Sequence, residues 1–355
     1  MKQIEKIIFS KLYNINQYSA EVLEKELSTD DSKSYIKMVV GDLLIMKNTK
    51  EFCKRSDSTE VISILCKEIP AQLNEAAVTL EVINDLEICN YSKQIAERLL
   101  REEIKAKDKY EANLKIKIKN GSLLTTLVET EDGYSYILAK IEHKPFIDNE
   151  DSFKHFGLPY ENSTLKGCVI NLNEEYSVVD IKVSDTGSTI AKYWSDDFLE
   201  FDEVNDDERN TNRAMVEINR VLNRYVNTTS EQDCVHLRQK MLGYFDNSVS
   251  YKHTEMIEAL LENFTPKSET IKIDEIRKKL NNLPEERNFD SSFEINKKIV
   301  DKKSKQHIEI SDDISLNFTK NIPNIEDRIK SDIEEGIKLL KIYKINEDTY
   351  KLFKK

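Results

Sequence analysis

Long apolar runs are missing from this 355-residue sequence. No stretch reaches the about 18 apolar residues that a membrane-spanning helix needs, so none is expected. The N-terminal residues MKQIEKIIFSKLY also lack the apolar core and the small-residue cleavage site of a signal peptide. Glycine (8) and proline (6) are scarce, which excludes a collagen-like or low-complexity chain. The five cysteines are an odd number without zinc-site spacing, which favours reduced thiols in the cytoplasm.

Recognisable catalytic motifs are also missing. The sequence contains no Gly-rich phosphate loop, nucleophile elbow or paired-histidine zinc helix, and its five histidines are scattered. A dense acidic run from Asp196 to Glu208 lacks the central glycine and alternating ligands of a calcium loop. We therefore expect neither a cofactor nor a metal site, and no catalytic residue is assigned.

One short pattern keeps an enzyme open as an alternative. Asp180 and Lys182 lie two residues apart in the apolar run VVDIKV. Metal-dependent nucleases of the restriction type use a strand carboxylate for magnesium and such a lysine to orient the attacking water. Glu174 or Glu175 would supply the further acid. The alternative hypothesis is thus a magnesium-dependent DNA nuclease, which could serve in defence against phage.

Positive charge is in deficit overall, since the formal net charge is −12. An acidic chain is repelled by nucleic-acid phosphates, so binding to them would need a local basic face. Residues 209–224 offer one. At 100° per residue, one side of the predicted helix carries the apolar stripe Met215, Ile218, Leu222 and Tyr225. Four arginines fall within about 60° of each other on the opposite side: Arg209, Arg213, Arg220 and Arg224.

Such a row of guanidiniums suits a row of phosphates. The alternative is a solvated helix face whose arginines pair with nearby acids. Asn205 is the expected N-cap of this helix, with Glu208 as its capping-box partner.

Strand patterns dominate the first two thirds of the chain. Strands are expected at residues 3–12, 113–119, 123–129, 134–143, 169–172 and 176–183, and a helix at 35–45. The dipeptides Asn120-Gly121 and Asp132-Gly133 predict hairpin turns. The fold class is therefore α+β, with an antiparallel sheet and packed helices in residues 1–227.

A second, mainly helical domain is predicted for residues 228–355, after a polar break at 227–230. Helices are expected at 231–245, 252–264 and 272–280, and terminal strands at 307–310, 314–318 and 337–345. This order predicts a winged-helix-like module. Its wing, or else a solvated loop, would carry the basic run Lys297, Lys298, Lys302, Lys303 and Lys305.

The sequence resembles the NdpA family of bacterial 37-kilodalton nucleoid-associated proteins. The similarity follows the segments IEKIIFSKL, YIKMVVGDLL, GSLLTTLVETEDGYSYILAKIEHK, DIKVSDTGSTIAKYWSDDFL, ERNTNRAMVEINRVL and DISLNFT. It implies a cytoplasmic, nucleoid-linked, DNA-binding protein that is acidic overall and has no known catalytic machinery. By this resemblance, Lys192 and the residues from Arg209 to Arg224 belong to the family's characteristic block.

The leading hypothesis is non-catalytic, largely sequence-independent binding of double-stranded DNA. The contacts would come from the four arginines, with Lys192 and the lysine run second. A homodimer would double these basic faces. A third hypothesis is a protein-interaction module whose acidic loop docks a DNA-processing partner.

Overall fold

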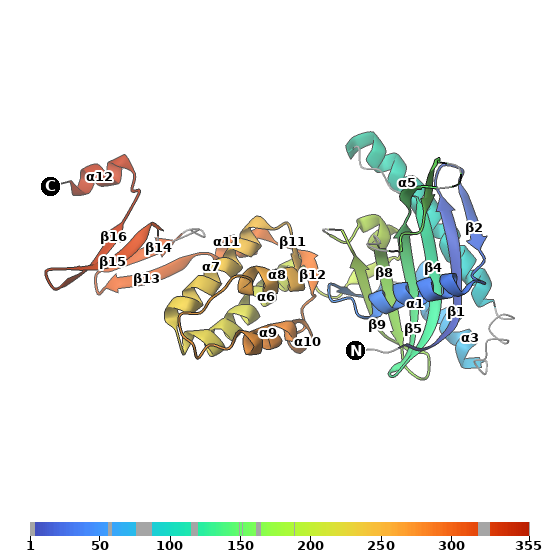
Figure 1. The fold of residues 1–355 in the computed structure, drawn as a ribbon, viewed down its shortest axis with the longest axis horizontal. Helices are drawn as coiled ribbons and strands as arrows, with labels where there is room; N and C mark the ends of the chain where they lie inside the picture. Colours follow the sequence, from blue (N-terminus) through green and yellow to red (C-terminus); the bar gives the residue numbers. More distant parts are fainter. Residues whose placement is uncertain are drawn as a thin grey trace.

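The computed structural model describes residues 4–55, 59–75, 87–114, 120–148, 150, 152–160, 165–187, 189–318 and 327–354. Three parts follow one another along the long axis (Figure 1). We call residues 4–203 the sheet module, residues 207–303 the helical module and residues 306–354 the terminal hairpins. The sheet module lies at one end, and the C-terminus lies at the other.

The sheet module is built on an antiparallel sheet. In the described part of the chain this sheet has eight strands in the order β10-β3-β9-β8-β5-β4-β1-β2. The predicted turn at Asp132-Gly133 is confirmed, since Gly133 adopts a φ of +123° where β4 turns into β5. The strands are β1 (Ile4–Asn16), β2 (Glu21–Lys25), β3 (Lys50–Lys54), β4 (Gly121–Thr130), β5 (Gly133–Glu142), β8 (Leu165–Leu172), β9 (Val178–Asp185) and β10 (Phe201–Glu203).

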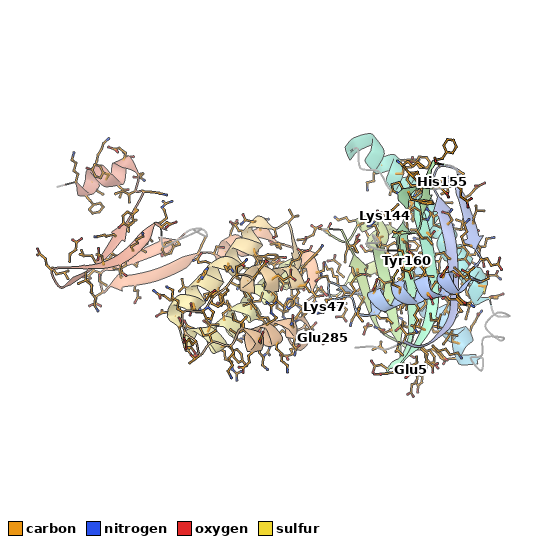
Figure 2. The ribbon with its side chains drawn as sticks, viewed as in Figure 1. Glu5, Lys47, Lys144, His155, Tyr160 and Glu285 are labelled. Carbon is orange, nitrogen blue, oxygen red and sulfur yellow. The ribbon has the colours of Figure 1, made fainter. Side chains whose placement is uncertain are left out.

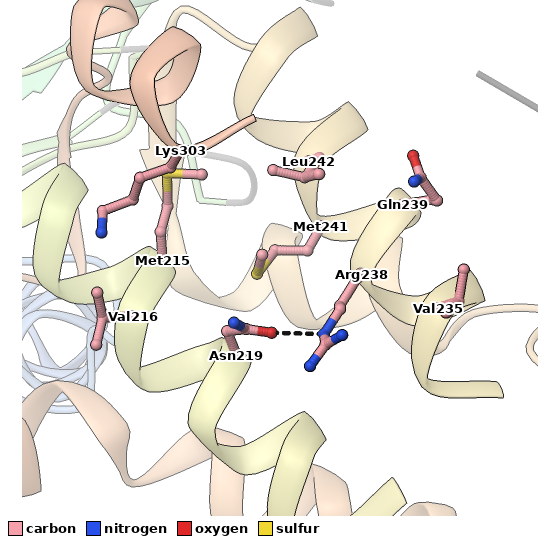
Figure 3. A pocket seen from close by; sticks show the side chains of 9 residues that line it. All are labelled: Met215, Val216, Asn219, Val235, Arg238, Gln239, Met241, Leu242 and Lys303. Carbon is pink, nitrogen blue, oxygen red and sulfur yellow. Dashed lines mark hydrogen bonds between the residues drawn. The ribbon is translucent and has the colours of Figure 1, made fainter. Parts of the chain in front are cut away.

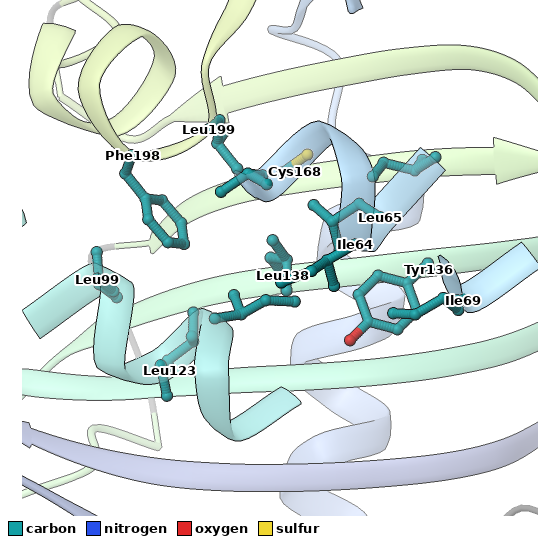
Figure 4. Close-up of a cluster of buried hydrophobic side chains, with 14 of the residues drawn as sticks. Ile64, Leu65, Ile69, Leu99, Leu123, Tyr136, Leu138, Cys168, Phe198 and Leu199 are labelled. Atoms are coloured by element: carbon teal, nitrogen blue, oxygen red, sulfur yellow. The ribbon is translucent and has the colours of Figure 1, made fainter. Parts of the chain in front are cut away.

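Helices cover both faces of this sheet. Helix α1 (Asp30–Leu44) packs Val39, Val40 and Leu43 on one face. Its N-cap Thr29 accepts a hydrogen bond from the Ser32 amide at 3.2 Å. The other face is covered by α2 (Glu60–Ser63), η1 (Ile64–Glu68), α3 (Ile69–Glu75), α5 (Ile88–Leu114) and η2 (Tyr193–Phe198). Leu99, Leu138 and Phe198 belong to the core there (Figure 4).

The strand expected at residues 113–119 is wrong where the structure describes it. Asn113 and Leu114 are the last two residues of helix α5. An alternating pattern is a local signal, whereas a long helix that packs on the sheet carries its hydrogen-bond ladder through these residues. Residues 115–119 lie outside the described residues.

The helical module has its own core. Buried residues from Ala214 to Val300 form one apolar cluster, which includes Met215, Ile218 and Leu222 of α6. Helix α6 therefore packs with the C-terminal helices, which favours a boundary between Phe201 and Ala214 over the expected break after residue 227. The elements are α6 (Asp207–Leu222), η3 (Asn223–Asn227), α7 (Glu231–Asn247), β11 (Ser250–Lys252), α8 (His253–Leu261), α9 (Ile273–Asn281), α10 (Leu283–Arg287), β12 (Ser292–Glu294) and α11 (Lys297–Lys303).

Four of the five lysines of the basic run lie in a helix, and Lys305 lies just beyond its end. Residues 297–303 form helix α11, whose N-cap Asn296 accepts hydrogen bonds from the amides of Lys298 and Ile299. Val300 is fully buried in the module's core, so one apolar residue among the lysines holds the helix in place.

The terminal strands are confirmed. Strands β13 (Gln306–Ser311) and β14 (Ile314–Phe318) form one hairpin, and β15 (Ile329–Glu334) and β16 (Ile337–Ile342) form another. Helix α12 (Glu347–Phe353) comes after them. The α+β class is therefore correct, with a large antiparallel sheet, packed helices and strands near the C-terminus.

Candidate nucleic-acid interface

Helix α6 begins one residue later than predicted. Asp206, not Asn205, is the N-cap, and its carboxylate accepts from the Arg209 amide at 2.6 Å. Both residue types are good caps, and burial decides between them. Asn205 is 1% exposed, and its carbonyl accepts from the Asn210 side chain at 3.2 Å. The helix then runs directly into the π-helical turn η3, which carries Arg224.

Arg213 is used to hold another helix. Its Nη1 donates to the carbonyls of Arg287, at 3.3 Å, and of Asn288, at 2.8 Å. Those carbonyls end helix α10, where a cation is favourable. Arg213 therefore fastens α10 to α6, and the residue as a whole is half-buried.

Arg220 shares a carboxylate with an arginine from α10. Its Nη1 donates to both oxygens of Glu217 at 2.6 Å, and Arg287 Nε lies 3.4 Å from one of them. Arg287 thus extends the row of guanidiniums beyond α6. No sequence pattern points to it, because Arg287 reaches this face only through the packing of α10 on α6.

Arg209 and Arg224 are the most available members of the row. Both are exposed. The Arg224 guanidinium lies 5.6 Å from the ring centroid of Tyr225, a cation–π contact that leaves its hydrogen-bond donors open. In the described part of the chain, the Arg209 side chain has no ion pair. We call Arg209, Arg213, Arg220, Arg224 and Arg287 the arginine face.

A second group of cations borders α6 on its other side. Arg238 of α7 donates from Nε to Asn219 at 2.8 Å, and also to Asn223. Arg238 and Lys303 line a pocket of about 330 Å³ between α6 and α7, with Met215 and Met241 at its floor (Figure 3). Lys303 is therefore the member of the lysine run that the fold brings to α6.

The other lysines have different surroundings. Lys297 caps the end of α7, since its Nζ donates to the carbonyls of Phe245, Asp246 and Ser248 at 2.6–2.8 Å. It is bound to the protein's own backbone. The remaining predicted cations are exposed: Lys298, Lys302 and Lys305 around α11, and Lys192 directly before η2 in the sheet module.

Much of the acidic loop is engaged inside the chain. Glu203 and Asp207 lie 2.7 and 2.8 Å from Nζ of Lys50, a side chain that is 4% exposed. Burial alone would lower the pKa of Lys50, but these two carboxylates hold it above its ordinary value. Asp202, at 2.7 Å, and Asp196 pair with Arg55. The loop thereby ties β3 to β10 and to the start of α6.

The residues of the nuclease alternative lie on β9. Asp180 accepts from the Asn171 amide at 2.5 Å, and Lys182 lines a cavity of about 780 Å³ between the two modules. Lys47 and Glu285, from opposite sides of this junction, also line it (Figure 2). Glu174 and Glu175 lie in the exposed β8–β9 turn. Among the described residues, no three His, Cys, Asp or Glu side chains gather as a metal site.

Comparison with known proteins identifies the family of the chain. A family model for the nucleoid-associated protein YejK matches residues 10–339. The chain belongs to this family. The match spans both modules and reaches β16, and it confirms the resemblance to nucleoid-associated proteins. A search of curated proteins gives no match. Within the described ranges, no helix is long and apolar enough to cross a bilayer.

Proposed function

We propose that this member of the nucleoid-associated YejK family binds double-stranded DNA in the nucleoid, in the cytoplasm of a bacterium, through phosphate contacts from the arginine face. The family supports DNA as the ligand. The observation that carries the proposal is the face itself: five arginines lie along α6, its continuation η3 and α10, and Glu217 is the carboxylate that pairs with two of them.

The members of the face have separate roles. Arg209 and Arg224 are open and contact phosphates directly. Arg220 and Arg287 share the carboxylate of Glu217, and their own side chains are 59% and 48% exposed, so N–H donors that face solvent can reach a phosphate. Arg213 positions α10 and therefore Arg287. Lys303 and the exposed lysines of α11 come second, and Lys192 is a separate contact on the sheet module.

Binding of this kind has little sequence preference. Contacts to phosphate oxygens fix the position of a protein on DNA and carry no direct information about the bases. The net charge of −12 makes a localised face necessary, because the rest of the surface repels the duplex. Binding releases counterions that are condensed on the DNA, and added salt opposes this release. The affinity for DNA should therefore fall steeply as the salt concentration rises.

The test is a salt titration of binding to a generic fluorescent duplex, followed by anisotropy. The double variant Arg209→Gln/Arg224→Gln should reduce the slope of log K against log salt by about 2, since each phosphate contact contributes about 0.9. Lys33→Gln/Lys37→Gln, on the exposed side of α1, removes the same charge elsewhere and should leave the slope unchanged.

Two outcomes would contradict the proposal. Equal loss in both variants would mean that only total charge matters, and no binding by the wild type at low salt would exclude DNA as the ligand. The same reactions with magnesium should leave a long duplex intact. Cleavage by the wild type that is lost in Asp180→Asn would instead establish the nuclease alternative.

A further inference from the structure

In the part of the terminal hairpins that the structure describes, there are apolar side chains but no buried core. None of residues 309–318 and 327–354 is buried. Yet large apolar side chains are strongly exposed there, among them Ile314 (59%), Ile333 (65%), Ile337 (63%) and Leu352 (76%). Exposed apolar groups this dense mark a surface that is covered in use.

The hairpin β15–β16 is amphipathic. Ile329 faces Ile342 across the ladder, and Ser331 faces Leu340. Opposed residues lie on the same side of a sheet, so these four share one face with Ile333 and its opposite residue Lys338, and four of the six are apolar. The other face is more charged: Lys341 pairs there with Asp332 and Glu334 at 2.6 Å, beside the apolar Ile337 and Leu339.

The hairpin β13–β14 repeats this design. Ile314 and Leu316 alternate with Ser315 and Asn317 along β14, so its apolar residues point to one side. The two hairpins belong to separate two-stranded sheets. A two-stranded hairpin alone is marginally stable in water, and it needs further strands or a second layer on its apolar face. The described chain supplies neither.

We propose that the terminal hairpins form the interface between two copies of this chain. Charge favours a second copy over another partner. Residues 306–355 contain ten acidic and nine basic residues, so they carry one of the twelve net negative charges. Two copies would repel each other least at this segment, whereas a strongly charged partner would find no complementary charge.

Geometry also supports a second copy of the chain as the partner. A two-fold interface must be self-complementary, and both an apolar hairpin face and an open antiparallel strand edge meet this condition. The segment also lies at the end of the long axis opposite the sheet module (Figure 1), so pairing there leaves the sheet module uncovered. This proposal does not depend on DNA binding.

The test measures the mass of the full chain by sedimentation velocity over a wide concentration range without DNA. The wild type should sediment at twice 41.4 kDa. Ile333→Asp/Leu340→Asp, on the apolar face of β15–β16, should sediment as the monomer. Ile314→Asp/Leu316→Asp tests β13–β14 in the same way and should also give the monomer.

A matched control uses another exposed hairpin. Ile147 (71% exposed) and Phe156 (61%) share one face of the hairpin formed by β6 (Lys144–Ile147) and β7 (Lys154–Gly157). Ile147→Asp/Phe156→Asp should remain dimeric. Emission of the buried Trp194 should be native-like in every variant. A wild type that is monomeric throughout, variants of the terminal hairpins that stay dimeric, or loss of the dimer only in the control would each overturn the proposal.

Discussion

Two buried groups of the helical module should affect the free energy of unfolding with opposite pH dependence in the same acidic range. Asp290 accepts from the Glu51 amide at 2.8 Å and from the Asn210 side chain at 2.6 Å, and burial raises its pKa to about 6. His253 lies 2.8 Å from the Leu280 carbonyl and 2.6 Å from the Tyr251 hydroxyl. Burial lowers the pKa of His253 to about 4.

The signs are set by which state binds the proton. Between pH 4 and 6 the folded protein protonates Asp290 and the unfolded chain does not, so this contribution to stability falls as pH rises. Below pH 6.5 the unfolded chain protonates a histidine that the fold keeps neutral, so the contribution of His253 rises with pH. Each shift corresponds to about 3 kcal/mol, and the two largely cancel in the wild type.

Single variants separate the two contributions. We would measure urea unfolding by far-UV circular dichroism between pH 4 and 7 and subtract the wild-type free energy of unfolding at each pH. With rising pH, Asp290→Asn should gain about 3 kcal/mol relative to the wild type. His253→Gln, which keeps a donor for the Leu280 carbonyl, should lose about as much. Differences that do not vary with pH would refute the assignment. Emission of Trp194, in the sheet module, serves as the control.

Two further predictions concern the sheet module. Lys140 and Glu103 form a buried pair at 2.5 Å, with side chains 1% and 0% exposed. The single variant Lys140→Met should therefore lower the free energy of unfolding by about 3–5 kcal/mol, and the double variant Lys140→Met/Glu103→Gln should recover most of this loss. Equal stability of the single and the double variant in urea would contradict this prediction. Burial raises the pKa of the Cys168 thiol, whereas Cys53 is exposed. A thiol reagent at neutral pH should label Cys53 first, and fast labelling that persists in Cys53→Ser would show otherwise.

Local patterns were enough to predict most of the sheet but not its edge. Strands β4, β5, β8 and β9 match short apolar runs that lie between glycine and polar turn residues, signals that act within a few residues. Strands β3 and β10 were missed, because each is short and has few apolar residues. Phe52 and Phe201 enter the core only when β3 pairs with β9 and β10, which are more than a hundred residues away.

Periodicity also predicted the arginine row, but not what each arginine does. The angle of a side chain around a helix says which face it occupies and nothing about what packs there. Arg213 is taken up by the end of α10, and Arg287 joins the face from that same helix. Lys297 was grouped with its neighbours by sequence, yet it caps α7. These differences all arise from contacts between elements distant in sequence.

The order of residues in the sequence misrepresents the charge of the acidic loop. Written out, Asp202, Glu203 and Asp207 run directly into Arg209, an order that would oppose any basic surface. In the fold, Lys50 is almost fully buried between Glu203 and Asp207, and Arg55 pairs with Asp202 and Asp196, so these two cations offset half of the charge of the four carboxylates. Salt screens the negative charge that remains over a Debye length of about 10 Å at 0.1 M ionic strength. The arginine face therefore lies in a less negative potential than the order of residues in the sequence suggests, which favours the proposed binding of phosphates there.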